Sequence, residues 1–264
     1  MTRFLISTVA CIVAALCSIS ALSAEQTEDV PFEPGVRDKA VLQFPAVGEI
    51  QQSLQDTGLV EDFATVEVRC SAPEWKKLSA VQSQLQFGSL MGELAFAAIR
   101  QHNPTTARCL EALLAGSKAL GVPEDSKSRQ ALQEVLGKVK TGTISAAQLL
   151  KVLDSLREQG LRDLADELDE EGMTVVTAAA WLRGGIVTAQ QVETEDQATA
   201  LAQLLAQPDL VQRIEASLAD ATGAEESDAR YRRIASQLLE LAHAEDPGRE
   251  ELEKFTALAE QLFS

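Results

Sequence analysis

Two long stretches of the chain carry almost no charge, and they constrain its fold more than any other feature. Residues 78–99 contain one charged side chain, Glu93, and residues 173–192 contain only Arg183. In both stretches apolar and small residues recur at the three- and four-residue steps of an α-helix. A helix that is apolar nearly all round belongs in the centre of a larger protein. The sequence therefore predicts two central helices with other helices around them.

The lone charge in each central helix predicts a contact between the two helices. A buried charge without a partner is costly, so it is expected to find an opposite charge or a water-filled cavity. We therefore expect Glu93 and Arg183 to pair. The pair would either fix the register of the helices or orient a ligand in a cavity, and register-setting is the better attested use. Gly88 and Gly92 suit close packing of helix backbones.

Helix signals continue through the rest of the chain. Four segments match the capping box: Ser71–Glu74, Ser145–Gln148, Thr194–Gln197 and Thr222–Glu225. Asn103 and Asp246 each place a capping side chain before a proline. The expected helices span residues 46–56, 72–101, 104–120, 125–140, 146–158, 161–170, 173–193, 195–206, 209–220, 224–243 and 247–262. The best strand candidate is only residues 65–68. The predicted fold is all-α, an irregular multi-helix bundle of antiparallel hairpins, because the connections are short.

The N-terminus predicts export. One Arg precedes an apolar run that closes on small residues, as in a secretory signal peptide over residues 1–24 with cleavage near Ala24. Residues 25–45 read as a disordered acidic linker. The main bundle is expected over 46–222, and a more charged helical hairpin, separate or packed on the bundle, over 223–264. No later segment reads as a membrane span, so the product is expected to be soluble in the periplasm or outside the cell.

Two cysteines, Cys70 and Cys109, remain after signal cleavage. An oxidising compartment favours a disulfide between them. A continuous helix over residues 72–101 opposes it, because the cysteines would then lie about 35 Å apart along the axis, whereas a disulfide needs Cα atoms within about 7 Å. We therefore predict free thiols if that helix is continuous. The disulfide can form only if the helix breaks at Gly88, or if the helix starts several residues later and is preceded by an extended segment.

The central helices also carry a resemblance. Glu93-Leu94-Ala95-Phe96, after Gly88 and Gly92, resembles a Gly-rich Asp-Leu-Ala-Tyr pattern of exported, uncharacterised all-helical bacterial proteins. In those proteins a second helix carries Gly-Trp followed by an acid. Here that position reads Ala180-Trp181-Leu182-Arg183, so Arg183 replaces the acid. The resemblance covers roughly residues 85–192 and implies export and a helical fold, but no activity.

The composition excludes some classes of function and identifies no catalytic centre. A net charge of -17 repels phosphate backbones, and 8 Phe, 2 Trp and 1 Tyr leave few side chains for base stacking, so nucleic-acid binding is not expected. The two histidines, His102 and His243, each fall near an expected helix C-terminus, where a cation is favoured. No nucleophile, phosphate-loop or cofactor motif occurs. We expect no cofactor and no catalytic residue.

An acidic cluster before Gly172 is the one candidate for a cation site. Carboxylates brought together by a turn suit a hard cation such as Ca²⁺, although the EF-hand order is absent. The alternative interpretation is that these carboxylates are exposed to solvent at the end of a helix and bind no ion. The cluster comprises Asp163, Asp166, Glu167, Asp169, Glu170 and Glu171.

Two functional hypotheses follow from these observations, beside a third class, hydrolysis by an unrecognised carboxylate pair, which is opposed by the fact that paired carboxylates at helical spacing are usually solvated faces. The first is an exported, non-enzymatic binding or scaffold protein that presents acidic helical faces to a protein or cell-envelope partner. The alternative is a carrier of a small apolar ligand in a cavity between the helices expected at residues 72–101 and 173–193, with Glu93 or Arg183 orienting a polar group of the ligand.

Overall fold

The structure, a computed structural model, describes residues 47–56, 58, 66–206, 208–221, 226–244 and 247–264. In these residues it is an all-α multi-helix bundle, as the sequence predicts. The expected signal peptide, the linker and the capping box at Thr222 lie outside the described residues.

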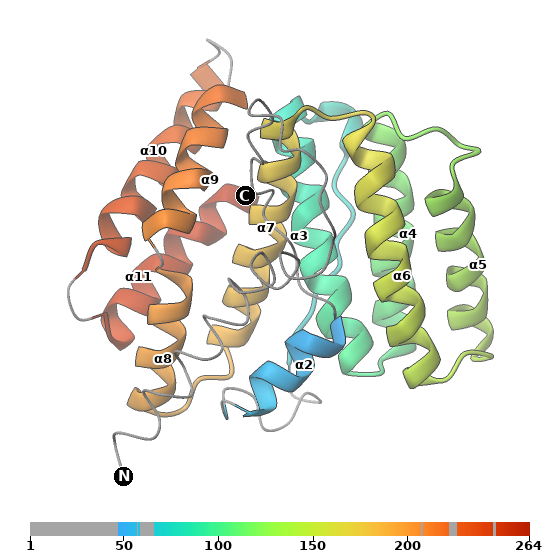
Figure 1. Ribbon diagram of the computed structural model, residues 1–264, viewed down its shortest axis with the longest axis horizontal. Coiled ribbons are helices and arrows are strands. Elements are labelled where there is room, and N and C mark those ends of the chain that lie inside the picture. The colour runs from blue at the N-terminus through green and yellow to red at the C-terminus, as the bar shows by residue number, and fades with distance from the viewer. Residues whose placement is uncertain (1–46, 57, 59–65, 207, 222–225, 245–246) are drawn as a thin grey trace, which may run out of the picture.

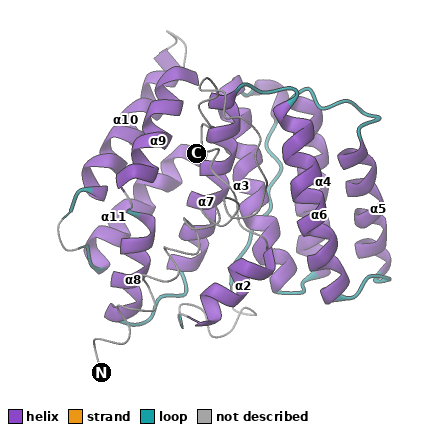
Figure 2. Cartoon of the chain, in the orientation of Figure 1, coloured by secondary structure: helices purple, strands orange, loops and turns teal. Residues whose placement is uncertain are grey.

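The helices form three groups, shown in Figure 1 and, by secondary structure, in Figure 2. Helices α3 and α7 lie in the middle, α4, α5 and α6 on one side, and α8 to α11 on the other. The bounds are α2 (Val47–Asp56), α3 (Ala80–Ile99), α4 (Asn103–Ala119), α5 (Lys127–Thr141), α6 (Ala146–Ala165), α7 (Glu170–Ala189), α8 (Glu195–Leu205), α9 (Pro208–Ala221), α10 (Glu226–Ala242) and α11 (Arg249–Glu260). Short 3-10 turns, η2 (Trp75–Lys77) and η3 (Gln261–Phe263), precede α3 and follow α11.

Side-chain caps fix several helix starts. The capping boxes expected at Ser145 and Thr194 are confirmed at the N-termini of α6 and α8. The box expected at Ser71 is wrong, because the cap of α3 is Ser79 with Gln82. His102 was expected to end a helix but instead caps α4, where its ring nitrogen accepts the backbone N–H of Thr105. In both cases the helix begins directly after the residue whose side chain accepts a hydrogen bond from a free N–H group of the first turn.

Helix α6 is continuous where the sequence suggested two helices. Residues 146–165 form one helix that runs through Gly160. Glycine costs a helix interior only about 1 kcal/mol relative to alanine, which burial of neighbouring leucines offsets. The expected break at residues 159–160 is therefore wrong.

The central helices α3 and α7 run parallel and touch along small residues. A Cβ added at Gly88 would lie 2.1 Å from the carbonyl oxygen of Val176, and one at Gly92 would lie 2.6 Å from that of Ala180. Consecutive helices are antiparallel, as the contacts of Ala97 with Thr106 illustrate for α3 and α4. Two central helices separated by three helices in sequence therefore point the same way.

Substituting Gly88 with alanine is expected to lower the free energy of unfolding by about 3 kcal/mol, at the upper end of the usual effect of overpacking. The added methyl group meets backbone atoms of α7, so the two helices must move apart. Gly137 in α5 is the matched control, because a Cβ there meets nothing within 4 Å. Gly137→Ala is expected to raise stability by up to about 1 kcal/mol. Urea denaturation measures both, and equal effects would contradict the close crossing.

Cys70 and Cys109 form a disulfide, with Cα atoms 4.8 Å apart. The prediction of free thiols is wrong because its premise fails: α3 starts at Ala80, not near residue 72. Residues 66–74 form no helix or strand. They run back along α3, since the side chain of Arg100 donates to the carbonyl of Val66 and the N–H of Cys70 donates to Glu93. This lead-in brings Cys70 beside α4.

The C-terminal helices pack on the rest of the bundle. α10 lies against α9, and α11 lies against α7 and α8. Their buried residues, including Leu238 and Phe255, belong to the same hydrophobic core as α3 and α7. Within the described part of the chain, no helix combines the length and the apolar character needed to cross a lipid bilayer.

Candidate functional site

Glu93 and Arg183 meet at the crossing of α3 and α7. Nε of Arg183 donates to Oε1 of Glu93 over 2.8 Å, and Nη2 donates to the same oxygen. The second carboxylate oxygen accepts the backbone N–H of Cys70 over 2.5 Å. Both residues are buried, at 4% and 8% exposure. The structure thus brings together the two residues singled out from the sequence, and both oxygens of the carboxylate bind protein donors.

Arg183 also joins the C-terminal helix to this pair. Its Nη1 donates to Glu260 of α11 over 2.7 Å, and its guanidinium carbon lies 5.9 Å from the centre of the Phe263 ring. The side chain of Gln86 donates to the backbone carbonyl of Phe263. One arginine therefore links α3, α7 and α11. Because its partners are protein groups, the arrangement suits a structural joint better than a ligand site.

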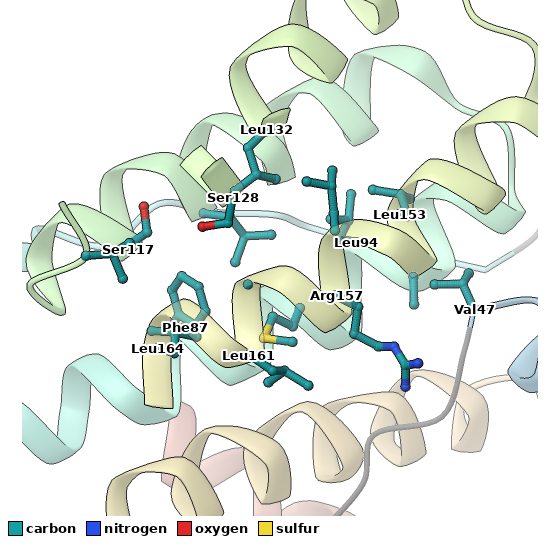
Figure 3. A pocket seen from close by; sticks show the side chains of 16 residues that line it. Val47, Phe87, Leu94, Ser117, Ser128, Leu132, Leu153, Arg157, Leu161 and Leu164 are labelled. Atoms are coloured by element: carbon teal, nitrogen blue, oxygen red, sulfur yellow. The ribbon is translucent and has the colours of Figure 1, made fainter. Parts of the chain in front are cut away.

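A cavity of about 80 Å³ lies on the other side of α3, between α3, α4, α5 and α6. Figure 3 shows the side chains that line it. Twelve are apolar: Val47, Phe87, Met91, Leu94, Ala95, Leu113, Val122, Leu132, Leu153, Leu156, Leu161 and Leu164; Gly160, Ser117, Ser128 and Arg157 complete the lining. The volume is several times what one water molecule needs, but the wall offers few polar partners to water.

The position of this cavity corrects the carrier hypothesis. That hypothesis placed a ligand between the helices expected at residues 72–101 and 173–193. At Gly88 and Gly92, however, α3 and α7 approach so closely that a single Cβ would clash. The larger side chains of α3, such as Phe87 and Leu94, point to the opposite face, where they line the cavity with side chains from α4, α5 and α6.

Gly160 explains why the space stays empty. Residues 153, 156, 157, 160, 161 and 164 of α6 line the cavity at three- and four-residue steps, which is one face of a helix. Gly160 sits within this face, and a Cβ built there meets nothing within 4 Å. A side chain is thus missing where α6 faces the core. The expected helices at residues 146–158 and 161–170 place Gly160 at a boundary, whereas a glycine within a leucine-rich helical face is also the sequence signal of a hollow.

Polar groups surround the cavity at three points. The hydroxyl of Ser117 donates to the carbonyl of Leu114, and the N–H of Ser128 donates to Asp163. The N–H of Val47 donates to Asp154 of α6 over 2.7 Å, which fixes the start of α2 at one edge. Figure 3 shows Val47 and Ser117 at opposite ends, with Arg157 on the side of Val47. These bonds hold the wall in place.

The residues of the acidic cluster lie at the end of α6, at the start of α7 and in the connection between them. Asp169 caps α7 by accepting the N–H of Gly172, and Glu170 and Glu171 occupy the first turn, where negative charge is favourable. The expected helix C-terminus is therefore largely a helix N-terminus. Burial alone would raise the pKa of Asp163, but hydrogen bonds from Ser128 and Gln159 outweigh it and hold this pKa below its usual value.

Asp166 ends α6 and Glu167 lies beside Gly121. Across the described residues, no three His, Cys, Asp or Glu side chains gather in an arrangement that could hold a metal ion. His243 follows the end of α10, as expected, and His102 serves as a helix cap. Most residues of the acidic cluster thus have a structural role, either in helix capping or in a loop contact.

Comparison with known proteins finds no family model, no curated protein and no solved structure that matches this chain. The resemblance of residues 85–192 to exported helical proteins therefore stays a prediction.

Proposed function

We propose that this protein is a non-enzymatic binding protein that holds a small apolar ligand in the cavity between α3, α4, α5 and α6. The observation that carries the proposal is the unfilled space beside Gly160. Protein interiors are normally packed to the density of organic crystals, so a hollow of this size costs stability. An apolar ligand that fills it would regain the lost contacts.

The wall chemistry supports an apolar ligand over a polar one. The cavity is lined mainly by apolar side chains, of which leucine is the commonest. Phe87 adds an aromatic surface, and Met91 adds a flexible side chain that can adapt to a ligand. Ligand sites of this kind combine an apolar wall with few polar groups that orient the ligand. Ser117, Ser128 and Arg157 are such groups here.

Export and a protein partner are further parts of the proposal. A disulfide between Cys70 and Cys109 supports an oxidising compartment, because such bonds persist there and are rare in the cytosol. A partner for the acidic helical faces stays a prediction from the net charge of -17. A pull-down from an envelope extract that recovers a stoichiometric protein would support it, and recovery of the bait alone would oppose it.

Gly160→Leu is expected to block the cavity without unfolding the protein. The wild-type protein should bind N-phenylnaphthylamine, a neutral apolar fluorophore, with an increase in fluorescence. The added isobutyl group occupies the same space, so affinity should fall by about tenfold or more, the equivalent of about two lost methylene contacts. Leucine also favours the helix, so stability should rise by up to about 1 kcal/mol.

Gly137→Leu is the matched control, since Gly137 also lies within a helix with nothing within 4 Å of its Cβ but does not line the cavity. It should gain stability and keep the wild-type affinity. If both variants bind the fluorophore equally well, or if the wild-type protein does not bind it, the proposal is wrong. Native mass spectrometry of the purified protein gives an independent test through a bound mass of a few hundred daltons.

A further inference from the structure

We propose that the ligand of this cavity is an aliphatic alcohol, with its chain in the hollow beside Gly160 and its hydroxyl group donating to Ser117. The inference rests on the proposed function and specifies the ligand. It follows from the two serines that line the cavity, Ser117 and Ser128, which are each 4% exposed. The hydroxyl hydrogens of both serines are bound within the protein, so their oxygens face a ligand as acceptors.

The hydroxyl hydrogen of Ser117 is committed to its own helix. Ser117 lies in the last turn of α4, and its Oγ donates to the backbone carbonyl of Leu114 over 3.0 Å. A hydroxyl oxygen that donates one bond keeps its lone pairs as acceptor sites. A ligand group that bonds to Ser117 therefore has to be a donor, which a hydroxyl is and an ether or ester oxygen is not.

Ser128 presents the same polarity to the cavity. Its backbone N–H donates to Oδ2 of Asp163 over 3.2 Å, its hydroxyl also bonds to this aspartate, and the hydroxyl of Ser126 lies 3.4 Å away. Although burial acts to raise the pKa of Asp163, hydrogen bonds from Ser128 and Gln159 hold this pKa below its usual value. The carboxylate is therefore ionised at neutral pH, and its negative charge beside Ser128 opposes an anionic ligand.

The two serines lie at one end of an otherwise apolar space. Figure 3 shows Ser117 and Ser128 on the side of the cavity away from Val47, and Leu153 on the side of Val47. Most of the remaining wall consists of apolar side chains from α3, α4, α5 and α6. A ligand with one polar end and an alkyl chain matches this distribution.

The polarity of this end selects the head group. A carboxylate would bring further lone pairs to the serine oxygens and would leave its charge without a donor there. An ammonium ion would donate, but two neutral oxygens are a poor replacement for its hydration shell in an apolar cavity. A hydroxyl is neutral and has one hydrogen to donate, which Ser117 accepts.

Competition between ligands of equal size tests the inference on the full chain. Octanol, 1-methoxyheptane, octanoate and octylamine would each displace N-phenylnaphthylamine at neutral pH, followed by fluorescence. The ether 1-methoxyheptane is the matched ligand, because it has the same atoms as octanol but no hydroxyl hydrogen. We expect octanol to bind about fivefold more tightly than the ether, the effect of one neutral hydrogen bond, and about tenfold or more tightly than either charged compound.

Ser117→Ala should lower the octanol affinity about fivefold, to that of the ether, and change the ether affinity by less than about twofold. Ser155→Ala is the matched control, because Ser155 in α6 also donates to a carbonyl of its own helix, that of Lys151, but is exposed and does not line the cavity. It should keep the preference for octanol. Ser117→Thr should also keep this preference, since it retains the hydroxyl group.

The outcomes separate this inference from the proposed function. If the ether binds the wild-type protein as tightly as octanol, or if Ser117→Ala keeps the preference, the alcohol assignment is wrong while the apolar site stands. If octanoate or octylamine binds more tightly than octanol, the head group is charged and the assignment fails. If none of the four compounds displaces the fluorophore and Gly160→Leu has no effect on it, the cavity is not a ligand site. The wild-type comparison of octanol with its ether decides the question even where Ser117→Ala does not fold.

Discussion

Replacing Arg183 with methionine is expected to lower the free energy of unfolding by about 3–5 kcal/mol, because the change leaves the carboxylate of Glu93 buried with one partner fewer. Glu93 is 4% exposed and accepts bonds from Arg183 and from the N–H of Cys70. Glu93→Gln should cost a comparable amount, since the guanidinium then loses the buried one of its two anionic partners and keeps only Glu260. Urea denaturation of the two single variants and the double variant measures the coupling.

An exposed pair of the same type provides the control. Arg249 donates to Glu195 over 2.7 Å, but the side chains are 34% and 73% exposed. Arg249→Met is therefore expected to cost less than about 1 kcal/mol. Silent single variants at Glu93 and Arg183, or effects that simply add, would show that the buried pair contributes no coupling energy.

The surroundings of the pair also determine the result of a charge swap. From the sequence alone, exchanging the two charges should recover part of the loss. In the structure, an arginine at position 93 would face the N–H of Cys70, and a glutamate at position 183 would face Glu260. Both new contacts are repulsive, so the double swap is expected to be no more stable than either single variant.

Removing the disulfide is the second change with a large expected effect. The bond closes a loop with a sequence separation of 39, and the chain-entropy relation assigns such a loop about 4 kcal/mol. The double variant Cys70→Ala/Cys109→Ala should lose about this amount in urea denaturation. Reduction of the wild-type protein should reproduce the loss, because both changes remove the same cross-link.

Local effects of the missing bond should appear in the lead-in. Cys70 has a positive φ of 46°, a conformation that costs a non-glycine residue about 1 kcal/mol or more. The disulfide and the bond to Glu93 hold it there. Hydrogen exchange of residues 66–74 should therefore accelerate in the alanine variant. Peptide mapping after thiol labelling of the unreduced, denatured protein should find Cys70 and Cys109 unlabelled, and labelling of both would refute the bond.

Local signals in the sequence predicted much of the fold. Nine of the expected helices begin within about three residues of their observed starts, because a cap or a proline fixes a helix end through contacts only a few residues away. The contact of Glu93 with Arg183 was also predictable, since a lone charge in each of two apolar helices leaves few alternatives. Both Ser71 and Ser79 match the pattern of an N-cap for α3, and the local pattern does not show that Ser79 is the one used.

The cavity and the disulfide needed three-dimensional information. Gly160 reads locally as a weak point of a helix, and only the packing of α6 on α3 turns it into the wall of a hollow. Cys70 reaches Cys109 because residues 66–74 fold back along α3, a path fixed by contacts with Glu93 and Arg100 far along the chain. Neither feature has a signature within a short window.

The sequence by itself determined that this protein is a bundle of helices with two nearly uncharged helices at its centre, because helical periodicity and capping act over a few residues and an apolar helix must be buried. The tertiary structure decided which face of α3 is closed and which is hollow. Glycines on one face let α7 approach until the backbones touch, while Gly160 on a neighbouring helix leaves the opposite face unfilled. Glycine thus permits close helix contact at one interface and leaves a cavity at the other, because its effect depends on whether the backbone of the opposite helix can approach it.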